Sequence, residues 1–440
     1  MKLRNYYLDY SLMHFIYKIF LILVFSLFIN SSWGNELFDS LNSAYLNNPK
    51  LNAERANMRA AREEKFESVS EFLPNVTISG YMSDQQNTKT GSSDSNFQPS
   101  EQSMTVEQKI FQGGSGVANF IKKKHGQTLG EFKLKKVEQE ILLEAAKAHT
   151  QLLLDRKKVN IYLINIDLLE RQVETDQNRL ETGEISLTDL AQSESSLAGA
   201  RADLIAAQND LVTTKANFMK VIGKKPKEDI KEVKEVRFNL PASLSAAYNI
   251  SKSENPDLQI SLLEYEQAKL DVVIAGSDLS PSATLKYKIA EQEDLSSTVK
   301  DRTQETITAT ATWPLFSGGK NLFSLRNTQE LRNQKELLYE DKKNEIETKV
   351  ANVWSSFQSS KSVLDSIRLQ VKAAEIASEG IMSEYESGNS RTTLEVIQSR
   401  KILLDSRINL ASAERNFLIS QFNVLSAIGR LTAKQLDLKK

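Results

Sequence analysis

In two long stretches of this sequence every seventh residue is apolar, with one exception, and this spacing constrains the fold more than any other feature. The first series is Ala145, Leu152, Val159, Ile166, Val173 and Leu180. The second follows 205 residues later and consists of Val350, Phe357, Leu364, Val371, Ser378 and Tyr385. A strict seven-residue spacing is typical of helices packed as left-handed coiled coils. We therefore predict long helical hairpins over residues 115–222 and 320–428, turning at Gly183 and Gly388, with first helices roughly 100 Å long at 1.5 Å per residue.

Other features recur at nearly the same offset, so we interpret the chain as an internal duplication. Gly113 and Gly114 recur as Gly318 and Gly319, and each pair separates a strand-like segment from a long helix. Glycine at such a transition permits a sharp change of direction without a side-chain clash. The predicted units are a first repeat over 35–223, a charged connector over 224–240, a second repeat over 241–429 and a short charged tail over 430–440.

Four shorter segments alternate apolar and polar residues, and two of them precede each glycine pair. In the clearest segment Ile307 and Ala309 alternate with Thr308 and Thr310. This period of two is typical of β-strands with one polar face. The predicted strands are residues 75–83, 101–111, 282–290 and 303–316, each pair being preceded by a helix. The expected fold class is a mixed but mostly α membrane protein.

The N-terminus has the pattern of a secretory signal peptide over residues 1–34. Basic residues up to Lys18 precede an apolar run, Ile19–Ile29, and small residues at Ser32 and Gly34 suit signal peptidase. This run is shorter than the about 20 residues of a membrane-spanning helix. A retained anchor is the alternative, and Met13 is a second candidate start. No later segment has the apolar length of a spanning helix, so any further membrane entry must use strands.

Composition excludes several classes of function. The net charge of −1 argues against nucleic-acid binding, which needs a basic surplus to meet phosphates. The chain has no cysteine, which excludes disulfides, thiolate metal sites and a lipid anchor on an N-terminal cysteine. Its histidines, His14, His125 and His149, are scattered. We expect no enzyme activity, no cofactor, no metal site and no nucleic-acid partner.

Four strands are too few to close a sheet in lipid. An open edge would leave backbone groups unsatisfied, each costing several kcal/mol, and the smallest closed membrane barrels use about eight strands. Two copies of the chain would make a barrel too narrow for a wet lumen. We therefore predict three copies, twelve strands in all, with the threonine-rich strand faces lining a channel and the long helices continuing it as an α-barrel.

Together these features resemble one family. The signal peptide, the duplicated strand–strand–hairpin unit, the "IFQGG" and "LFSGG" transitions and the "YESGNSRT" turn are similar to the TolC-type outer-membrane efflux proteins over about residues 36–430. The resemblance implies a homotrimer in the outer membrane of a Gram-negative bacterium, extending into the periplasm. It implies an exit duct for tripartite efflux or type I secretion, joined by a periplasmic adaptor to an ABC or proton-driven pump.

The resemblance also implies a gate near the hairpin turns. By position, Thr188 and Asp189 are expected as acceptors, with Tyr385 and Arg391 as donors. Arg391 lies three residues after Gly388, whereas the family usually places this arginine two residues after the glycine.

A ring of acidic residues at the constriction is the other implied feature. Glu395 occupies the first acidic position, but Gln398 stands where the second is expected, so the second ring lacks its carboxylate. Three copies of Glu395 would form one ring that favours cations.

One reading remains beside the duct. The heptads alone are also typical of a periplasmic or surface coiled-coil protein without a channel, and this rod would contain no strands. The cargo, the pump and the adaptor are not readable from the sequence, although the missing cysteine favours type I secretion or general export over the lipidated drug-efflux branch.

Overall fold

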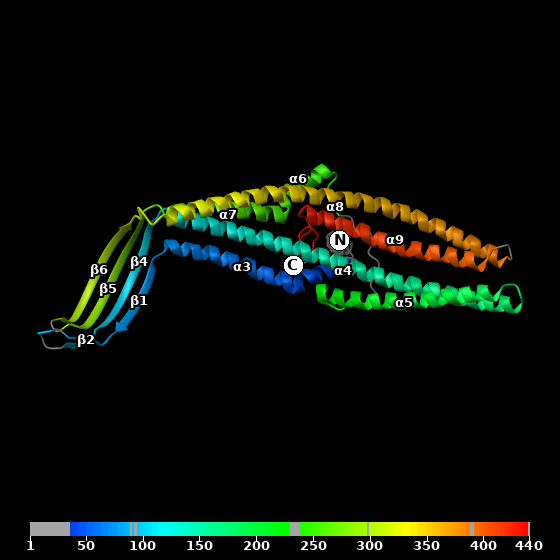
Figure 1. The fold of residues 1–440 in the computed structure, drawn as a ribbon, viewed down its shortest axis with the longest axis horizontal. Helices are drawn as coiled ribbons and strands as arrows, with labels where there is room; N and C mark the ends of the chain where they lie inside the picture. Colours follow the sequence, from blue (N-terminus) through cyan, green and yellow to red (C-terminus); the bar gives the residue numbers. More distant parts are fainter. Residues whose placement is uncertain are drawn as a thin grey trace, which may run out of the picture.

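The computed structural model of the chain describes residues 36–88, 90–91, 95–228, 238–296, 299–387 and 391–438. The molecule is elongated, with an antiparallel sheet at one end and helices running from it to the other end (Figure 1). The predicted signal peptide, Gly388 and residues 229–237 of the predicted connector lie outside the described residues. The mostly helical fold with a four-stranded sheet is as predicted, and a coiled-coil rod without strands is excluded.

The two halves of the chain have the same order of elements. The first half contains α2 (Glu36–Asn47), α3 (Pro49–Val69), η1 (Ser70–Phe72), β1 (Asn75–Met82), β4 (Ser100–Gln112), α4 (Ser115–Glu181) and α5 (Leu187–Ile222). The second half contains α6 (Leu244–Glu254), α7 (Pro256–Ser277), β5 (Ser282–Ser296), β6 (Val299–Thr312), α8 (Lys320–Glu386) and α9 (Thr393–Ala427). A small hairpin, β2 (Gln85–Asn87) and β3 (Ser95–Phe97), lies between β1 and β4. Every helix of the described ranges is too short or too polar to cross a membrane.

The single helix expected before each strand pair is in fact two helices, broken at Pro49 and Pro256. Proline is tolerated at the first helical position, and the asparagine before it caps the new helix. The Asn48 Oδ1 accepts from the backbone N–H of Lys50 at 3.0 Å, while its Nδ2 donates to the carbonyl of Val221 at 3.1 Å. Asn255 likewise donates to the carbonyl of Ala427 at 2.8 Å. Each break is therefore tied to the end of the returning helix.

The four main strands form one antiparallel sheet in the order β1-β4-β5-β6. One cross-strand row contains Val76, Val106, Tyr287 and Ile307, and the next row, on the opposite face, contains Thr77, Thr105, Lys288 and Thr306. The strands β5 and β6 run further than predicted, pairing as far as Ser296 and Val299, because antiparallel pairing continues beyond the amphipathic part. Strand β6 ends at Thr312, four residues before the predicted end, because Pro314 cannot donate to a ladder.

The helices lie side by side in one layer that continues the strand order. In the half of the layer next to the sheet, α3 packs along α4, α4 packs along α7, and α7 packs along α8. In the far half, α5 packs along α4, α4 packs along α9, and α9 packs along α8. Figure 1 shows α3 and α5 along one border of the layer and α8 along the other. The edge strands of the sheet continue these borders: β1 lies on the side of α3 and α5, and β6 lies on the side of α8. The chain is thus a layer with two open edges.

The core lies midway along the molecule, where both halves meet. Its fully or almost fully buried members include Leu37, Leu142, Ile222, Phe422 and Ile428. The tail, for which the sequence predicts no packing, joins this core through Leu431 and Leu436. Its amide at Ala433 donates to Glu138, and Arg430 pairs with Glu254 at 2.6 Å. Polar and charged residues separate these apolar positions in the tail sequence, so no periodic pattern reveals them.

Candidate functional site

The turn of the first hairpin is built by a glycine and a capping box. Gly183 adopts a left-handed conformation with φ +76°. Ser186 caps α5: its Oγ accepts from the backbone N–H of Asp189 at 3.3 Å, while the Asp189 carboxylate accepts from the Ser186 N–H at 3.0 Å. Hydrogen bonds from the Ser186 side chain and backbone lower the pKa of Asp189. Thr188 beside it is exposed, so both predicted acceptors lie at the tip.

The second turn repeats this design with charged residues. Thr392 and Glu395 form the capping box of α9. Arg391 donates to Glu384 at 2.6 Å and to Glu395 at 3.1 Å. The pKa of Glu395 is lowered by the Thr392 backbone N–H and then by Arg391. Gln398 is exposed on the next turn of α9. Within one chain, the predicted donor Arg391 is thus engaged with the second hairpin's own carboxylates.

Tyr385, the other predicted donor, reaches across to the first hairpin. Its side chain is 3% exposed, and its hydroxyl donates to Asp176 Oδ1 at 2.9 Å and lies 3.1 Å from Thr393 Oγ1. Arg179 lies over its ring, 4.5 Å from the centroid. Burial raises the pKa of Tyr385, and the Asp176 carboxylate raises it further. In this structure the acceptor of Tyr385 is Asp176, not Thr188 or Asp189, the two predicted acceptors.

Asp176 is the centre of a buried polar cluster that the sequence reading did not find. It is fully buried and accepts from Gln172 Nε2 at 2.9 Å on its own helix. It also accepts from Ser193 Oγ at 2.5 Å across the hairpin. With Tyr385 this gives the carboxylate three donors, as a buried charge requires.

The same arrangement occurs again three heptads earlier on α4. Asp155, 3% exposed, accepts from Gln151 Nε2 at 2.9 Å and from Thr214 Oγ1 of α5 at 2.7 Å. Both aspartates occupy positions of the heptad seam at which apolar residues are usual. An acidic residue within such a seam, followed by another 21 residues later, is the sequence signal that would have revealed them.

Arg400 of α9 adds a second contact between the hairpins at this level. Its Nη1 donates to the carbonyl of Leu168 on α4 at 3.0 Å, and its Nη2 lies 3.3 Å from Met382 Sδ. Burial lowers the pKa of Arg400, and the charge of Asp176 opposes this shift. The two hairpins of one chain are therefore joined at the tip by polar groups.

At the other end, the doubled glycines stand between strand and helix in both halves. Gly113, Gly114, Gly318 and Gly319 all have positive φ, from +60° to +89°. Gly114 and Gly319 cap the N-termini of α4 and α8. A Cβ at Gly113 would lie 2.7 Å from Ser280 Cβ, so this turn also needs the missing side chain for packing.

Comparison with known sequences gives a consistent result over almost the whole chain. The family model described as Outer membrane efflux protein matches residues 40–224 and 247–430. The outer membrane efflux protein BepC of Brucella suis is 26% identical over 92% of this chain and 87% of its own length. TolC of Vibrio cholerae is 22% identical, covering 92% and 93%. The alkaline protease secretion protein AprF of Pseudomonas aeruginosa is 20% identical, covering 91% and 86%.

Solved structures agree on the fold. The CmeC outer membrane channel of Campylobacter jejuni superposes with a TM-score of 0.82 at 14% identity, over 90% of this chain and 86% of that one. CusC superposes with a TM-score of 0.79 at 17% identity, over 92% and 96%. Since the family model covers both halves and the sheet-and-hairpin layer is that of solved channels, the chain belongs to the outer membrane efflux protein family, as the resemblance predicted, and is a protein of the outer membrane.

Proposed function

We propose that three copies of this chain form the exit duct of an export system, crossing the outer membrane and extending into the periplasm. The duct itself is passive, and an inner-membrane ABC or proton-driven pump supplies the energy through a periplasmic adaptor. The names of the relatives support this role, since BepC is an efflux protein and AprF a protease secretion protein. The relatives and the structural neighbours are channel proteins rather than enzymes.

The observation that carries the proposal is the open four-stranded sheet. Among the described strands, β1 and β6 each have a neighbour on one side only, and lipid offers no partner for backbone groups on the other side. Copies arranged around an axis pair β6 of one with β1 of the next. Three copies give a barrel of twelve strands. Two copies would give a barrel of about eight strands, and side chains fill the interior of a barrel of that size.

The two faces of the sheet suit lipid on one side and water on the other. The row of Val76, Val106, Tyr287 and Ile307 is largely apolar, and its members on the edge strands, Val76 and Ile307, are exposed in the single chain, as a lipid-facing surface requires. The opposite face carries the threonines and an ion pair, Lys288 Nζ to Glu101 Oε1 at 2.5 Å. Water in the lumen would solvate these groups.

We further propose that the tip of the hairpins is the gate. In the closed ring Thr188 and Asp189 accept from Arg391, while Tyr385 joins the two hairpins through Asp176. Glu395 forms a single acidic ring with Gln398 one turn away. The groups are suited to reversible contact, because the Arg391 side chain is 40% exposed and exposed ion pairs contribute only about 0.2–1 kcal/mol each. Adaptor binding can release contacts of that size by favouring the open state.

Purified protein in detergent and in planar bilayers tests the proposal. We expect a particle with the mass of three chains, mixed α and β circular dichroism, and a small single-channel conductance. Tyr385→Phe removes the donor to Asp176 and should raise the conductance. Tyr339→Phe, on the same helix but facing Tyr265 nearer the sheet, is the control and should leave it unchanged. A monomer that does not conduct would contradict the duct, and equal conductance of the two variants would contradict the gate.

A further inference from the structure

The two faces of the sheet differ in the sign of their charge. We call the face with Thr77, Thr105 and Thr306 the threonine face. Over the regular pairing of the four strands this face has four cations and two carboxylates, which gives it a net charge of +2 per chain. The cations are Lys109, Lys286, Lys288 and Arg302, and the carboxylates are Glu101 and Glu107.

The opposite face of the sheet, which carries Ile307, has the reverse charge. Lysine and arginine are absent from its paired rows in the described strands. Successive residues of a strand point to opposite faces, so that neighbours such as Asp301 and Arg302 lie on different sides of the sheet. The carboxylates of this face are Glu291, Glu293, Asp301 and Glu305. The charges of the sheet are thus sorted by face.

Each of the two carboxylates on the threonine face has a lysine beside it. Glu101 is 9% exposed, and it accepts from Lys288 Nζ at 2.5 Å and from Gln292 Nε2 at 2.6 Å. Glu107 Oε2 lies 3.9 Å from Lys286 Nζ. These two pairs are close to neutral, so the net positive charge of the face must come from its other cations.

Lys109 and Arg302 supply this excess charge. Both are exposed, and among the described residues neither has a carboxylate within ion-pair distance. Lys109 lies in the row of Thr310, eight residues from Arg302 along β6. At about 3.3 Å per residue the two levels are roughly 26 Å apart along the strand. Positive charge therefore occurs near both ends of the threonine face.

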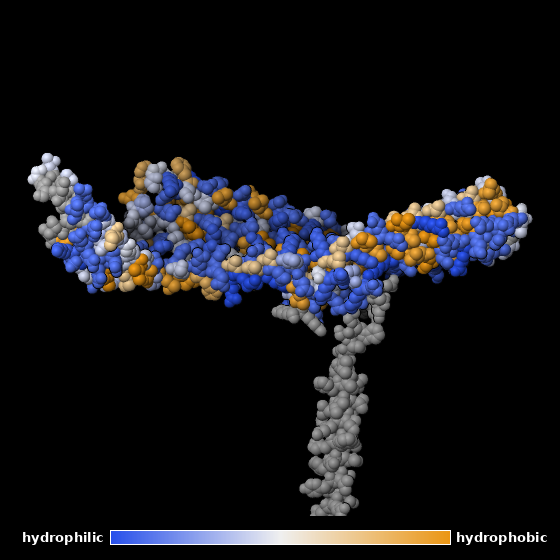
Figure 2. Space-filling model, turned by 90° about the horizontal axis from the view of Figure 1, so that it is seen from below, coloured by the Kyte–Doolittle hydropathy of each residue, from blue (hydrophilic) through white to orange (hydrophobic). Residues whose placement is uncertain are grey.

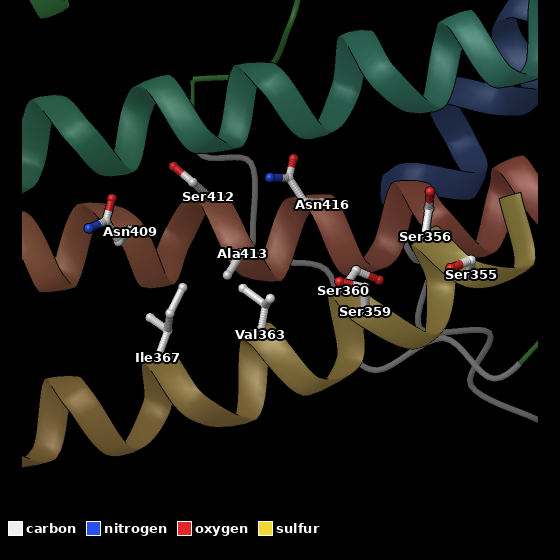
Figure 3. Close-up of a pocket in the computed structure, with 10 residues that line it drawn as sticks. All are labelled: Ser355, Ser356, Ser359, Ser360, Val363, Ile367, Asn409, Ser412, Ala413 and Asn416. Carbon is white, nitrogen blue, oxygen red and sulfur yellow. The ribbon is translucent and has the colours of Figure 1, made fainter. Parts of the chain in front are cut away.

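The helical part of the molecule offers no comparable charge where it is hollowed. A groove of ≈ 620 Å³ runs between α8 and α9, and all its lining residues are neutral: serines, asparagines, Val363, Ile367 and Ala413 (Figure 3). Seen from the border of α3 and α5, the sheet end at the left is largely hydrophilic (Figure 2). The sheet is therefore the part of the chain in which charge can act on a passing solute.

We infer that the threonine face makes the barrel lumen a cationic segment that favours anionic solutes, chiefly carboxylates and phosphates, at the exit of the duct. The inference rests on the proposed function, because copies of the chain must close around a lumen for this face to meet water. Three copies would place twelve cations and six carboxylates around that lumen. Rings of lysine and arginine line anion pores, and a water-filled cleft with low-dielectric walls focuses the field of such charges.

This charge is opposite in sign to that of the proposed Glu395 ring at the tip. The two segments are separated by helices roughly 100 Å long, whereas the Debye length at physiological ionic strength is about 8 Å. Each segment therefore acts only on solutes in its own part of the passage. A solute would meet an acidic entrance and a basic exit, so a measurement of the barrel must first remove the acidic ring.

Reversal potentials in planar bilayers under a KCl gradient test the inference, with Glu395→Gln in every channel. We expect this channel to pass Cl⁻ in preference to K⁺. Adding Lys109→Gln and Arg302→Gln should lower the permeability ratio of Cl⁻ to K⁺ about two- to fivefold, as expected when charges roughly 4–8 Å from an ion in water are removed. The matched control adds Glu291→Gln and Glu293→Gln, which remove two charges from the opposite face, and should leave the ratio unchanged.

Thiol modification measures the charge of the lumen without relying on conductance, and the chain has no cysteine of its own. Thr310→Cys, in the row of Lys109, should react faster with a sulfonate-bearing methanethiosulfonate than with a trimethylammonium-bearing one, each rate being divided by the rate with free cysteine. Lys109→Gln should reduce this preference about two- to fivefold. Thr188→Cys, exposed at the tip beside Asp189, is the reference and should not prefer the anionic reagent.

The failures are distinguishable. If the trimer conducts but prefers K⁺ in the Glu395→Gln channel, or if the two double variants shift the ratio equally, the cationic lumen is wrong and the proposed duct stands. Equal rates of the two reagents at Thr310→Cys, or no reaction with either, would also overturn it. If the particle is a monomer that does not conduct, the proposed function itself fails, and the inference fails with it.

Discussion

At the scale of single residues, His149 shows how burial in the core changes the pKa of a side chain. Its ring is fully buried, with Nδ1 2.9 Å from Ser40 Oγ and the centroid 6.2 Å from that of Phe218. Burial lowers the pKa of His149 from 6.5 to about 4, and the charge of Arg156 adds to the effect. The protonated ring would lose its hydration there, so the folded chain keeps His149 neutral.

This predicts a loss of stability in mild acid. The unfolded chain binds a proton at His149 below pH 6.5, whereas the folded chain does so only near pH 4. The stabilisation is present above pH 6.5 and is lost as pH falls toward 4, by about 2 kcal/mol between pH 7 and 5. Denaturant unfolding in detergent at a series of pH values measures how the free energy of unfolding depends on pH. His149→Gln should flatten this dependence on pH. The same dependence in the unchanged protein and in His149→Gln would refute the assignment.

The tip shows which residue roles can be predicted from the sequence. Tyr385 lies on the heptad stripe, so its burial follows from spacing alone. Its acceptor does not, because Asp176 lies 209 residues earlier on another hairpin and no local rule joins them. The capping boxes at Ser186 and Thr392 have local signatures, with an acid three residues after the cap. Sequence reasoning therefore finds the turns more readily than the contacts between them.

At the scale of elements, long-range periodicity was a better guide than local composition. The heptads predicted α4, α5, α8 and α9 within a few residues, because one packing rule acts over many turns. The strand ends were less predictable, since pairing with a neighbour carries β5 beyond its alternating part. The tail was missed because its apolar residues, Leu431 and Leu436, find their partners in the distant core.

The strand-to-helix turn offers a matched pair of substitutions. Gly113 and Gly114 both have positive φ, so alanine at either should cost roughly 1–2 kcal/mol in backbone strain. A Cβ at Gly113 would also lie 2.8 Å from the carbonyl oxygen of Ser277, whereas a Cβ at Gly114 would meet nothing within 4 Å. We expect Gly113→Ala to cost roughly 1–3 kcal/mol more than Gly114→Ala because of this crowding. Thermal unfolding followed by circular dichroism compares them, and equal melting temperatures would contradict the packing argument.

At the scale of the whole molecule, strand alternation determines which side of the sheet meets lipid. Ile307 and Thr308 are neighbours on β6 and point to opposite faces. Ile307 is 73% exposed in the single chain, and the apolar row to which it belongs crosses all four strands. The closed ring stays a prediction that rests on the cost of unpaired backbone groups in lipid, because no single strand encodes the number of copies.

Ile307→Arg and Thr308→Arg separate the two faces. Arginine on the lipid-facing side of a barrel costs about 2–4 kcal/mol at the bilayer midplane, whereas a water-filled lumen solvates it. We therefore expect Ile307→Arg to reduce the amount of oligomer recovered from outer membranes and Thr308→Arg to leave it near normal. Gel mobility of unheated membrane samples gives the measurement. The opposite ranking would reverse the assignment of the faces.

The two buried aspartates also limit how the first hairpin can move. Asp155 and Asp176 meet Thr214 and Ser193, and both partners on α5 are separated by the same 21 residues as the acids. If α5 slid by one heptad toward the core, the carboxylates would face Ala207 and Ser186, and Asp155 would lose its hydroxyl partner; if it slid the other way, they would face Val221 and Ala200. These two contacts fix the register of α4 and α5, so we expect any movement of the first hairpin to carry both helices together as one rigid unit.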